Sequence, residues 1–170
     1  NGKEIYKGKI SQAEAEIRIL NYWRPYHLVL KKLMTETHKK FGTAILIDCH
    51  SMPTLPNHSG PKQLQKMPDI ILGDRFGGSA DRDIVDKIES IFVREGFSVG
   101  RNVPFSGAFI TKEYGLPSSN RHALQIEIRR SLYMKEETLC LNDNFNYFKD
   151  IFGYILGQIA KIGEISKPVG

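Results

Sequence analysis

The sequence predicts one α/β domain with a mixed or mostly parallel sheet flanked by helices. Two observations support this fold class. Short apolar runs that end in polar residues alternate with longer segments whose apolar residues recur every three or four positions. The length of 170 residues, with 41% hydrophobic and 25% charged residues, is typical of one globular core. We therefore expect residues 1–170 to form a single domain.

The first element is expected to be a long helix from Ser11 to about Lys40. Ser11 and Glu14 form a capping box, in which each side chain accepts a hydrogen bond from the other residue's backbone amide. Pro25 marks the point where a kink is expected, and Gly42 ends the helix. One face is apolar, with residues three or four positions apart: Ile17, Leu20, Trp23, His27, Leu30 and Met34.

Four segments follow this helix. Thr43–Ile47 is apolar without alternation, which predicts a strand buried on both faces of a sheet. Asp48–Pro68 is polar and rich in proline, which predicts a long loop. Asp69–Leu72 reads as a second short strand, and Asp81–Glu95 as an amphipathic helix that ends at Gly96.

The second half of the chain is expected to contain three strands and a helix. Phe97–Val99 and Ala108–Ile110 are short apolar segments, and His122–Ile128 alternates between apolar and polar residues in its second half. A long final helix is expected over Glu136–Ile162. Because strands and helices alternate, the order fits a sheet flanked by helices.

Composition narrows the cellular setting and the class of partner. No stretch reaches ~18 uninterrupted apolar residues, so we expect no membrane segment. Cys49 and Cys140 lie far apart without CxxC spacing, which argues against a disulfide framework and favours a cytoplasmic location. The net charge of +5 is spread along the chain, which favours a small acidic ligand over nucleic acid.

A first candidate site follows the first predicted strand. Asp48, Cys49, His50 and Ser51 stand at its carboxyl end, where α/β sheets bind ligands. An imidazole is a good zinc ligand, and a nearby carboxylate can bind the metal or orient the ring. In the alternative reading, Asp48 and Ser51 cap the loop and His50 bonds to a carbonyl.

A second candidate site lies on the strand predicted near the end of the chain. Gln125, Glu127 and Arg129 share one strand face because side chains alternate with a period of two. A carboxylate placed in this way can act as a general base toward a metal-bound water. The alternative is a solvated face with a Glu–Arg ion pair.

For most of the other notable polar residues and for the glycine-rich segment, the pattern indicates a structural role rather than a role in the site. His27 lies on the apolar face of the first helix, and Cys49 should point away from His50, as a buried thiol. His122 could reach the edge of the site from the start of its strand. Gly73–Gly78 lacks the lysine of a phosphate-binding loop, so a tight turn is the better interpretation.

Five segments together resemble the N-formylglutamate amidohydrolase (N-formylglutamate deformylase) family. They are "RILNYWRPYH", "ILIDCHSMP", "PDIILGDRFGGSAD", "NVPFSGAFITKEYGLP" and "HALQIEIRRSLYM". The resemblance implies a phosphorylase/hydrolase-like α/β fold, similar to that of zinc carboxypeptidases and cell-wall amidases. It also implies zinc-dependent hydrolysis of N-formyl-L-glutamate to formate and glutamate, a step of bacterial histidine breakdown.

The resemblance also implies roles for individual residues. His50 would be a zinc ligand and Glu127 the catalytic carboxylate, with Asp48 and Gln125 orienting these two groups. The expected contacts to the substrate's carboxylates or carbonyl oxygen come from six residues: Ser51, Arg75, Asn102, Ser106, Arg129 and Arg130. Arginine suits such a role because its planar donors bind carboxylates in pairs.

The chain also departs from the family pattern. Full-length members carry an earlier segment with a "PHSG"-like motif that resembles the first zinc ligands, whereas a catalytic zinc usually has three protein ligands. We therefore expect this chain to lack an N-terminal portion and, when alone, to hold only part of the zinc site. Asn57–Gly60 imitates the motif at another position, so His58 is expected to be an ordinary loop residue rather than a ligand.

Two other functions stay open at this point. A metal-free relative could bind acidic amino-acid ligands without catalysis. A basic nucleic-acid binder is the third reading, although the sequence shows no platform of aromatic and basic residues such as an RNA-recognition motif.

Overall fold

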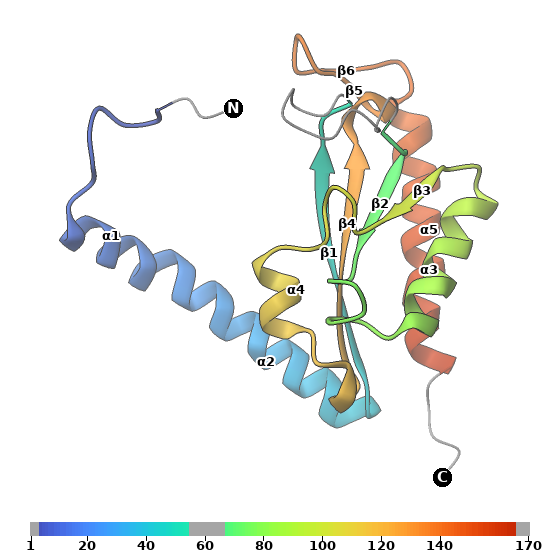
Figure 1. Cartoon of the computed structure of the whole chain (residues 1–170), viewed down its shortest axis with the longest axis horizontal. Helices are drawn as coiled ribbons and strands as arrows, with labels where there is room; N and C mark the ends of the chain where they lie inside the picture. The colour runs from blue at the N-terminus through green and yellow to red at the C-terminus, as the bar shows by residue number, and fades with distance from the viewer. Residues whose placement is uncertain (1–3, 55–66, 166–170) are drawn as a thin grey trace.

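The centre of the protein is a four-stranded mixed sheet (Figure 1). The structure is a computed structural model that describes residues 4–54 and 67–165. The strand order is β1 (Ala44–Met52), β4 (Arg121–Arg129), β2 (Ile70–Gly73) and β3 (Val99–Arg101). β1 runs parallel to β4 and β2 parallel to β3, while β2 and β4 are antiparallel. The predicted α/β class with a mixed sheet is confirmed.

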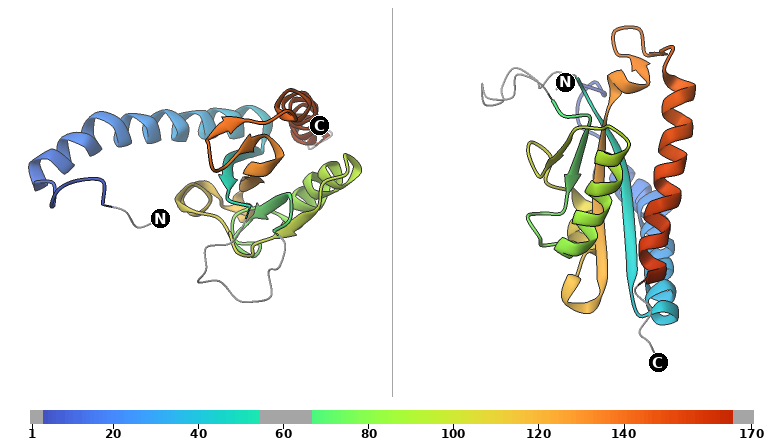
Figure 2. Two further views of the ribbon diagram at one scale, coloured as in Figure 1. Left: turned by 90° about the horizontal axis from the view of Figure 1, so that it is seen from above. Right: turned by 90° about the vertical axis from the view of Figure 1, so that its right-hand side faces the viewer.

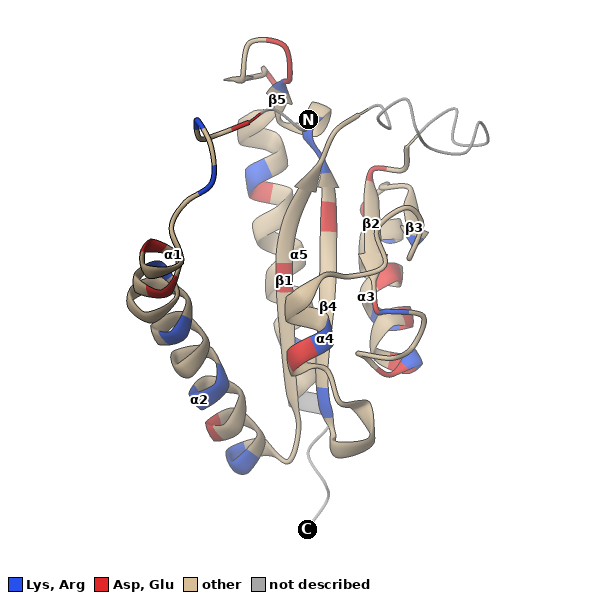
Figure 3. Ribbon diagram, turned by 60° about the vertical axis from the view of Figure 1, so that its left-hand side comes forward, with Lys and Arg blue, Asp and Glu red and all other residues tan. Residues whose placement is uncertain are grey.

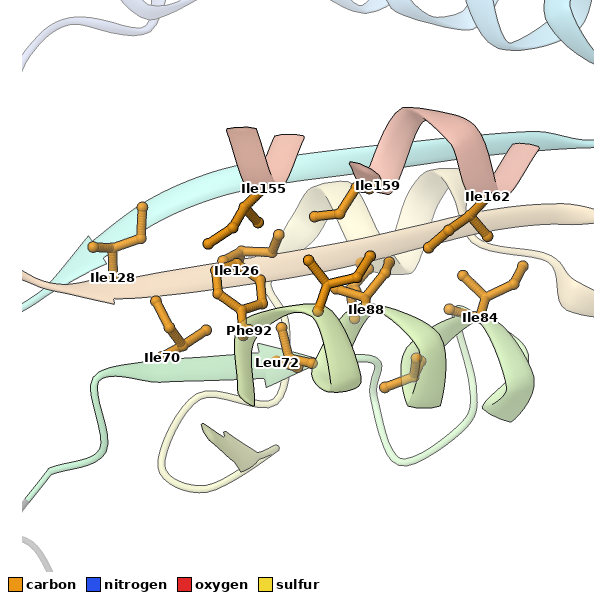
Figure 4. Close-up of a cluster of buried hydrophobic side chains, with 14 of the residues drawn as sticks. Ile70, Leu72, Ile84, Ile88, Phe92, Ile126, Ile128, Ile155, Ile159 and Ile162 are labelled. Atoms are coloured by element: carbon orange, nitrogen blue, oxygen red, sulfur yellow. The ribbon is translucent and has the colours of Figure 1, made fainter. Parts of the chain in front are cut away.

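Helices cover both faces of this sheet. α3 (Arg82–Arg94) and α5 (Phe145–Ile165) lie on one face, and the short α4 (Phe109–Tyr114) lies on the other (Figures 1 and 2). The main core lies between the sheet and helices α3 and α5. Figure 4 shows Ile126 and Ile128 of β4 facing isoleucines of α5, such as Ile155. Each fully buried side chain of this size stabilises the fold by about 1.5–3 kcal/mol.

The first helix consists of three consecutive segments. α1 (Gln12–Arg18) is followed by a π-helical turn, η1 (Ile19–Trp23), and then by α2 (Arg24–Phe41). Its two ends agree with the prediction. The Ser11 hydroxyl accepts from the Glu14 amide at 3.2 Å, and Gly42 closes α2 in the left-handed conformation with φ 74°. The wider turn ends two residues before Pro25, which has no amide hydrogen for a regular helical bond.

The predicted apolar face of this helix is mostly not buried. Met34 is the one buried residue in the three segments, while Ile17, Leu20 and Trp23 are exposed. Figure 2 shows why, since α1 and the first half of α2 extend away from the sheet and its other helices.

β1 is longer and more exposed than the sequence predicts. It continues through Ser51 to Met52, so Asp48–Met52 is strand and not loop. The prediction of burial on both faces is also wrong, because β1 is an edge strand whose apolar residues Ile45–Ile47 are only partly buried. β1 pairs with β4 over nine consecutive residues, and this pairing keeps its polar end, Asp48–Met52, in the strand conformation. Residues 55–66 of the predicted loop lie outside the described part of the chain.

Three further element boundaries are corrected. Ala108–Ile110 is not a strand, because Phe109–Tyr114 forms α4. The strand expected at Phe97–Val99 lies two residues later, as β3. The final helix begins at Phe145 rather than at Glu136, because a hairpin of β5 (Met134–Lys135) and β6 (Cys140–Leu141) precedes it.

The strand and helix expected at Asp69–Leu72 and Asp81–Glu95 are confirmed by β2 and α3. In the described residues, no helix combines the length and the apolar character that a membrane crossing requires.

Candidate active site

The pairing of β1 with β4 joins the two candidate sites. Asp48 lies opposite Gln125, and His50 lies opposite Glu127. Directly paired residues point to the same face of a sheet, so these four side chains form one polar row on the face that α4 partly covers. Figure 3 shows the acidic positions of β1 and β4 on these neighbouring strands.

Glu127 is a buried carboxyl group held by Gln125. The Gln125 side-chain amide donates to Glu127 Oε1 at 2.7 Å, and its carbonyl oxygen accepts from the Ala108 amide at 2.8 Å. Both ends of the Gln125 side chain are therefore fixed, which orients the carboxyl group beside it. No pattern in the sequence indicates the Ala108 contact, because Ala108 was expected in a strand.

His50 lies between two carboxyl groups. Its Nε2 is 3.0 Å from Asp48 Oδ2, and its Nδ1 is 3.9 Å from Glu127 Oε1. Burial raises the pKa of Glu127, and the negative charge of Asp48 adds to that rise. Three neighbours lower the pKa of Glu127: His50, Gln125 and Arg130. Glu127 is only 7% exposed as a side chain, whereas His50 is 41% exposed. A buried carboxyl group of raised pKa beside an accessible imidazole is an arrangement found in general acid–base sites.

The described residues alone do not fit a complete zinc site. Within residues 4–54 and 67–165, no group of three His, Cys, Asp or Glu side chains is placed to hold a metal ion. A catalytic zinc usually has three protein ligands, and here His50 directs both nitrogens toward carboxyl groups. His58 lies outside the described residues.

The two neighbouring arginines have different surroundings. Arg129 bonds to Asp69 Oδ1 at 2.5 Å and to the Met67 carbonyl at 2.9 Å, so its guanidinium ties the end of β4 to the segment before β2. Arg130 instead bonds to the Ser51 hydroxyl at 3.2 Å, and its charge lowers the pKa of Glu127. Arg130 therefore acts on the Glu127 carboxyl group through its charge, whereas the Arg129 guanidinium is engaged by Asp69 and the Met67 carbonyl.

Asn102 organises the turn that carries Arg75. Its side-chain oxygen accepts from the amides of Asp74 and Phe76 at 3.1 and 3.2 Å, and its nitrogen donates to Asp74 Oδ1 at 2.6 Å. The side chain of Asn102 is thus engaged within the protein. Arg75 has φ 56° and an exposed side chain, and its amide donates to the Ser106 carbonyl at 2.7 Å. The expected tight turn at Gly73–Gly78 is confirmed by the Gly78 amide, which donates to the Arg75 carbonyl.

Three residues that the sequence singled out lie outside the polar row. His27 is partly buried and its Nδ1 lies 2.6 Å from the Tyr114 hydroxyl, in agreement with the core role expected for it. His122 is buried near the start of α3. Cys49 is exposed, so the expected burial of its thiol is wrong; it lies on β1, the edge strand of the sheet.

Sequence comparisons connect this chain to known proteins. A family model described as N-formylglutamate amidohydrolase matches residues 1–134. The chain is 33% identical over 140 residues to an N-formylglutamate deformylase of Pseudomonas aeruginosa, covering 81% of this chain and 52% of that protein. It is 32% identical over 153 residues to an N-formylglutamate deformylase of Pseudomonas putida, covering 88% of this chain and 54% of that protein.

Solved structures agree with these matches. The N-formylglutamate amidohydrolase of Ralstonia eutropha JMP134 is 32% identical, with a TM-score of 0.83 over 94% of this chain and 58% of that chain. A gene product of Agrobacterium tumefaciens that is 18% identical shares the fold, with a TM-score of 0.56. The chain spans about half the length of the curated relatives it matches. Its sequence and fold show that it belongs to the N-formylglutamate amidohydrolase family.

Proposed function

We propose that this chain carries the catalytic carboxyl group of an amidohydrolase that converts N-formyl-L-glutamate to formate and L-glutamate. The observation that supports this most is the β1–β4 register, which places buried Glu127 opposite accessible His50. Two relatives named N-formylglutamate deformylase support the choice of substrate.

Glu127 has the properties that amide hydrolysis requires of a general acid–base group. We propose that it takes a proton from the attacking water as the water oxygen bonds to the formyl carbon. The same proton is then delivered to the amide nitrogen as the carbon–nitrogen bond breaks, which releases formate and the free amino group. Gln125 keeps the Glu127 carboxyl group in place through its 2.7 Å hydrogen bond.

We also propose that His50 is one ligand of a zinc ion or another divalent metal, with the remaining ligands outside the described residues. Such a metal acts as a Lewis acid and activates water when it is bound. Asp48 supports this role for His50, because a carboxyl group 3.0 Å from one ring nitrogen can fix the orientation of the ring.

The substrate carboxylates need cationic partners near the polar row. Arg75 and Arg130 are the two arginines that we propose for this, with Ser51 holding Arg130 and with Asn102 and Ser106 holding the turn of Arg75.

Cys49 and Cys140 are both free, which supports a cytoplasmic setting for the reaction.

The test is release of formate from N-formyl-L-glutamate, measured together with bound zinc. Because the chain spans about half of its relatives, it is assayed alone and with the complementing segment, defined as the part of the Pseudomonas putida relative outside the 153 matched residues. We expect formate release and bound zinc in at least one of these preparations, with both reduced at least tenfold by His50→Ala. Binding of N-formyl-L-glutamate without formate release would contradict the proposal and favour a binding protein without catalysis.

A further inference from the structure

Thr111 is a completely buried polar residue in the middle of α4. Its hydroxyl donates to the Ala108 carbonyl at 2.9 Å, one turn earlier. Threonine hydroxyls in helices can bond to a carbonyl of the preceding turn, as exposed Thr35 does to the Lys31 carbonyl at 2.7 Å. Thr111 differs from Thr35 in two respects, because it is buried and because its acceptor also contacts the candidate site.

Ala108 is held through both of its backbone polar groups. Its amide donates to the Gln125 side-chain oxygen at 2.8 Å. Its carbonyl accepts from the Thr111 hydroxyl at 2.9 Å and from the Lys112 amide at 3.2 Å. No side-chain hydrogen bond from Ala108 caps the start of α4 in the described structure. The Thr111 hydroxyl is therefore the side-chain group that fixes this residue.

The residue before Ala108 is closely packed. Gly107 has φ 111°, a conformation that L side chains rarely adopt. A methyl group at this position would lie 2.5 Å from Thr111 Oγ1 and 3.2 Å from Arg75 Cγ. The backbone can pass this close to both side chains only because residue 107 is a glycine. Thr111 thus restrains the segment by packing as well as by its hydrogen bond.

Three consecutive hydrogen bonds connect Thr111 to Glu127. The first joins Thr111 to Ala108 at 2.9 Å, the second joins Ala108 to Gln125 at 2.8 Å, and the third joins Gln125 to Glu127 Oε1 at 2.7 Å. A backbone amide can only donate, so Gln125 turns its oxygen toward Ala108 and its NH2 group toward Glu127. The direction of the Ala108 amide therefore decides which end of Gln125 meets the carboxyl group.

This chain of bonds occupies one oxygen of Glu127. Oε1 accepts from Gln125 and lies 3.9 Å from His50 Nδ1. Within the part of the chain that the structure describes, no hydrogen bond reaches Oε2. A Gln125 side chain turned over would place its own oxygen against Oε1, and two acceptors without a hydrogen between them repel each other. The observed orientation therefore holds Oε1 and leaves Oε2 available.

We infer that Thr111 is a positioning residue for the proposed reaction and acts on Glu127 through Ala108 and Gln125. The inference rests on the proposed role of Glu127 as the general acid–base group. The Thr111 hydroxyl keeps the Ala108 amide directed at Gln125, so that Oε2 is the oxygen that takes the proton from water and delivers it to the amide nitrogen. A displacement of about 1 Å from a productive geometry can lower a rate by about 10²-fold.

The first measurement is nuclear magnetic resonance on the isotope-labelled chain alone, without metal or substrate. Thr111→Val removes the hydroxyl and keeps the shape of the side chain. We expect it to speed exchange of the Ala108 amide hydrogen at least about fivefold and to shift the Gln125 side-chain NH2 signals. Thr111→Ser keeps a hydroxyl, and its exchange rate should stay within about twofold of the wild type.

Ser79→Ala is the matched control for Thr111→Val. Ser79 is also 0% exposed, and its hydroxyl donates to the Ala123 carbonyl at 2.8 Å. The control thus removes the same kind of buried bond at a position outside the chain that ends at Glu127. We expect it to leave the Ala108 exchange rate and the Gln125 signals unchanged.

The second measurement is formate release from N-formyl-L-glutamate in the preparation with the complementing segment. Thr111→Val should lower kcat about tenfold and leave KM within about twofold, because the contacts to the substrate stay in place. Thr111→Ser and Ser79→Ala should each keep kcat within about twofold of the wild type. In a Gln125→Met background, Thr111→Val should have no further effect, since Thr111 acts through Gln125.

Three results would overturn the inference. They are unchanged Ala108 exchange in Thr111→Val, a kcat of Thr111→Val equal to that of the wild type, and an equal loss of kcat in Ser79→Ala. Failure of the proposed reaction looks different, because the wild type itself would then release no formate in any preparation. The exchange rates and the Gln125 signals would still decide in that case whether Thr111 positions Glu127.

Discussion

Glu127 is a carboxyl group whose chemistry depends on its neighbours. Burial raises its pKa, while Gln125 holds one oxygen and His50 stands 3.9 Å from the same oxygen. Its orientation depends on Gln125, which is itself fixed by the Ala108 amide. Two strands and the segment before α4 thus determine where one carboxyl group points.

His122 provides a test of burial at a second titratable residue. It is 2% exposed, and burial lowers its pKa against the opposing charge of Asp81. The Asp81 amide donates to His122 Nδ1 at 3.3 Å, a bond that needs this nitrogen unprotonated. Below the unfolded pKa of about 6.5, the unfolded chain therefore binds a proton that the folded chain resists, and the free energy of unfolding should fall.

The measurement is urea unfolding of the wild type and His122→Asn at pH 7.5 and 5.5. Asparagine cannot titrate, although its oxygen can still accept a hydrogen bond. We expect the variant to lose less stability than the wild type between these two values. Equal losses would show that His122 does not contribute to the pH dependence.

The two arginines at the end of β4 should differ in their effect on stability. Arg129→Met removes the partner of Asp69 and the bond to the Met67 carbonyl, which should lower the free energy of unfolding by about 1.5–3 kcal/mol. Arg130→Met should change it by less than about 0.5 kcal/mol, because its contacts are exposed. Denaturant unfolding of both variants measures this, and equal effects would contradict the distinction.

At the scale of the elements, the sequence predicts best where a pattern is local. Ser11, Gly42 and Gly96 mark helix ends by their own backbone chemistry, and all three stand at such ends. β1 is different, because its polar end is extended by pairing with β4, far away in the sequence. Alternation showed that Gln125 and Glu127 share a face, but only this pairing places them opposite Asp48 and His50.

Gly73 tests how closely two elements pack next to the site. A methyl group there would lie 2.7 Å from the Gly107 amide nitrogen and 2.8 Å from the Ser106 carbonyl carbon. Gly73→Ala should therefore push this segment away from β2 and lower the free energy of unfolding by about 1–3 kcal/mol. Calorimetric or urea unfolding measures the effect.

Gly157 on α5 is the matched control for that substitution. Among the described residues, no atom outside the neighbouring helix backbone lies within 4 Å of the position of its added methyl group, and the residue is exposed in a helix. Gly157→Ala should raise the free energy of unfolding by about 0.5–1 kcal/mol, because alanine favours the helix. A loss of stability at Gly157, or none at Gly73, would contradict this account of the packing.

At the scale of the whole molecule, the site lies beside the open edge of the sheet. The closed face, between the sheet and helices α3 and α5, holds the main core. The opposite face holds the polar row, and the exposed side of β1 lies next to it. The sequence predicted the α/β class from alternating elements, but it could not show that the long helix would project, since its apolar face looked like a core face.

The measurement that tests the central claim most directly is the rate of formate release from N-formyl-L-glutamate by Glu127→Gln. It is compared with the wild type and with Glu36→Gln, an exposed carboxylate on α2, in the preparation with the complementing segment. We predict that Glu127→Gln lowers the rate by about 10²–10⁴-fold and that Glu36→Gln stays within twofold of the wild type. A Glu127→Gln rate within tenfold of the wild type would show that this carboxyl group is not the catalytic acid and base.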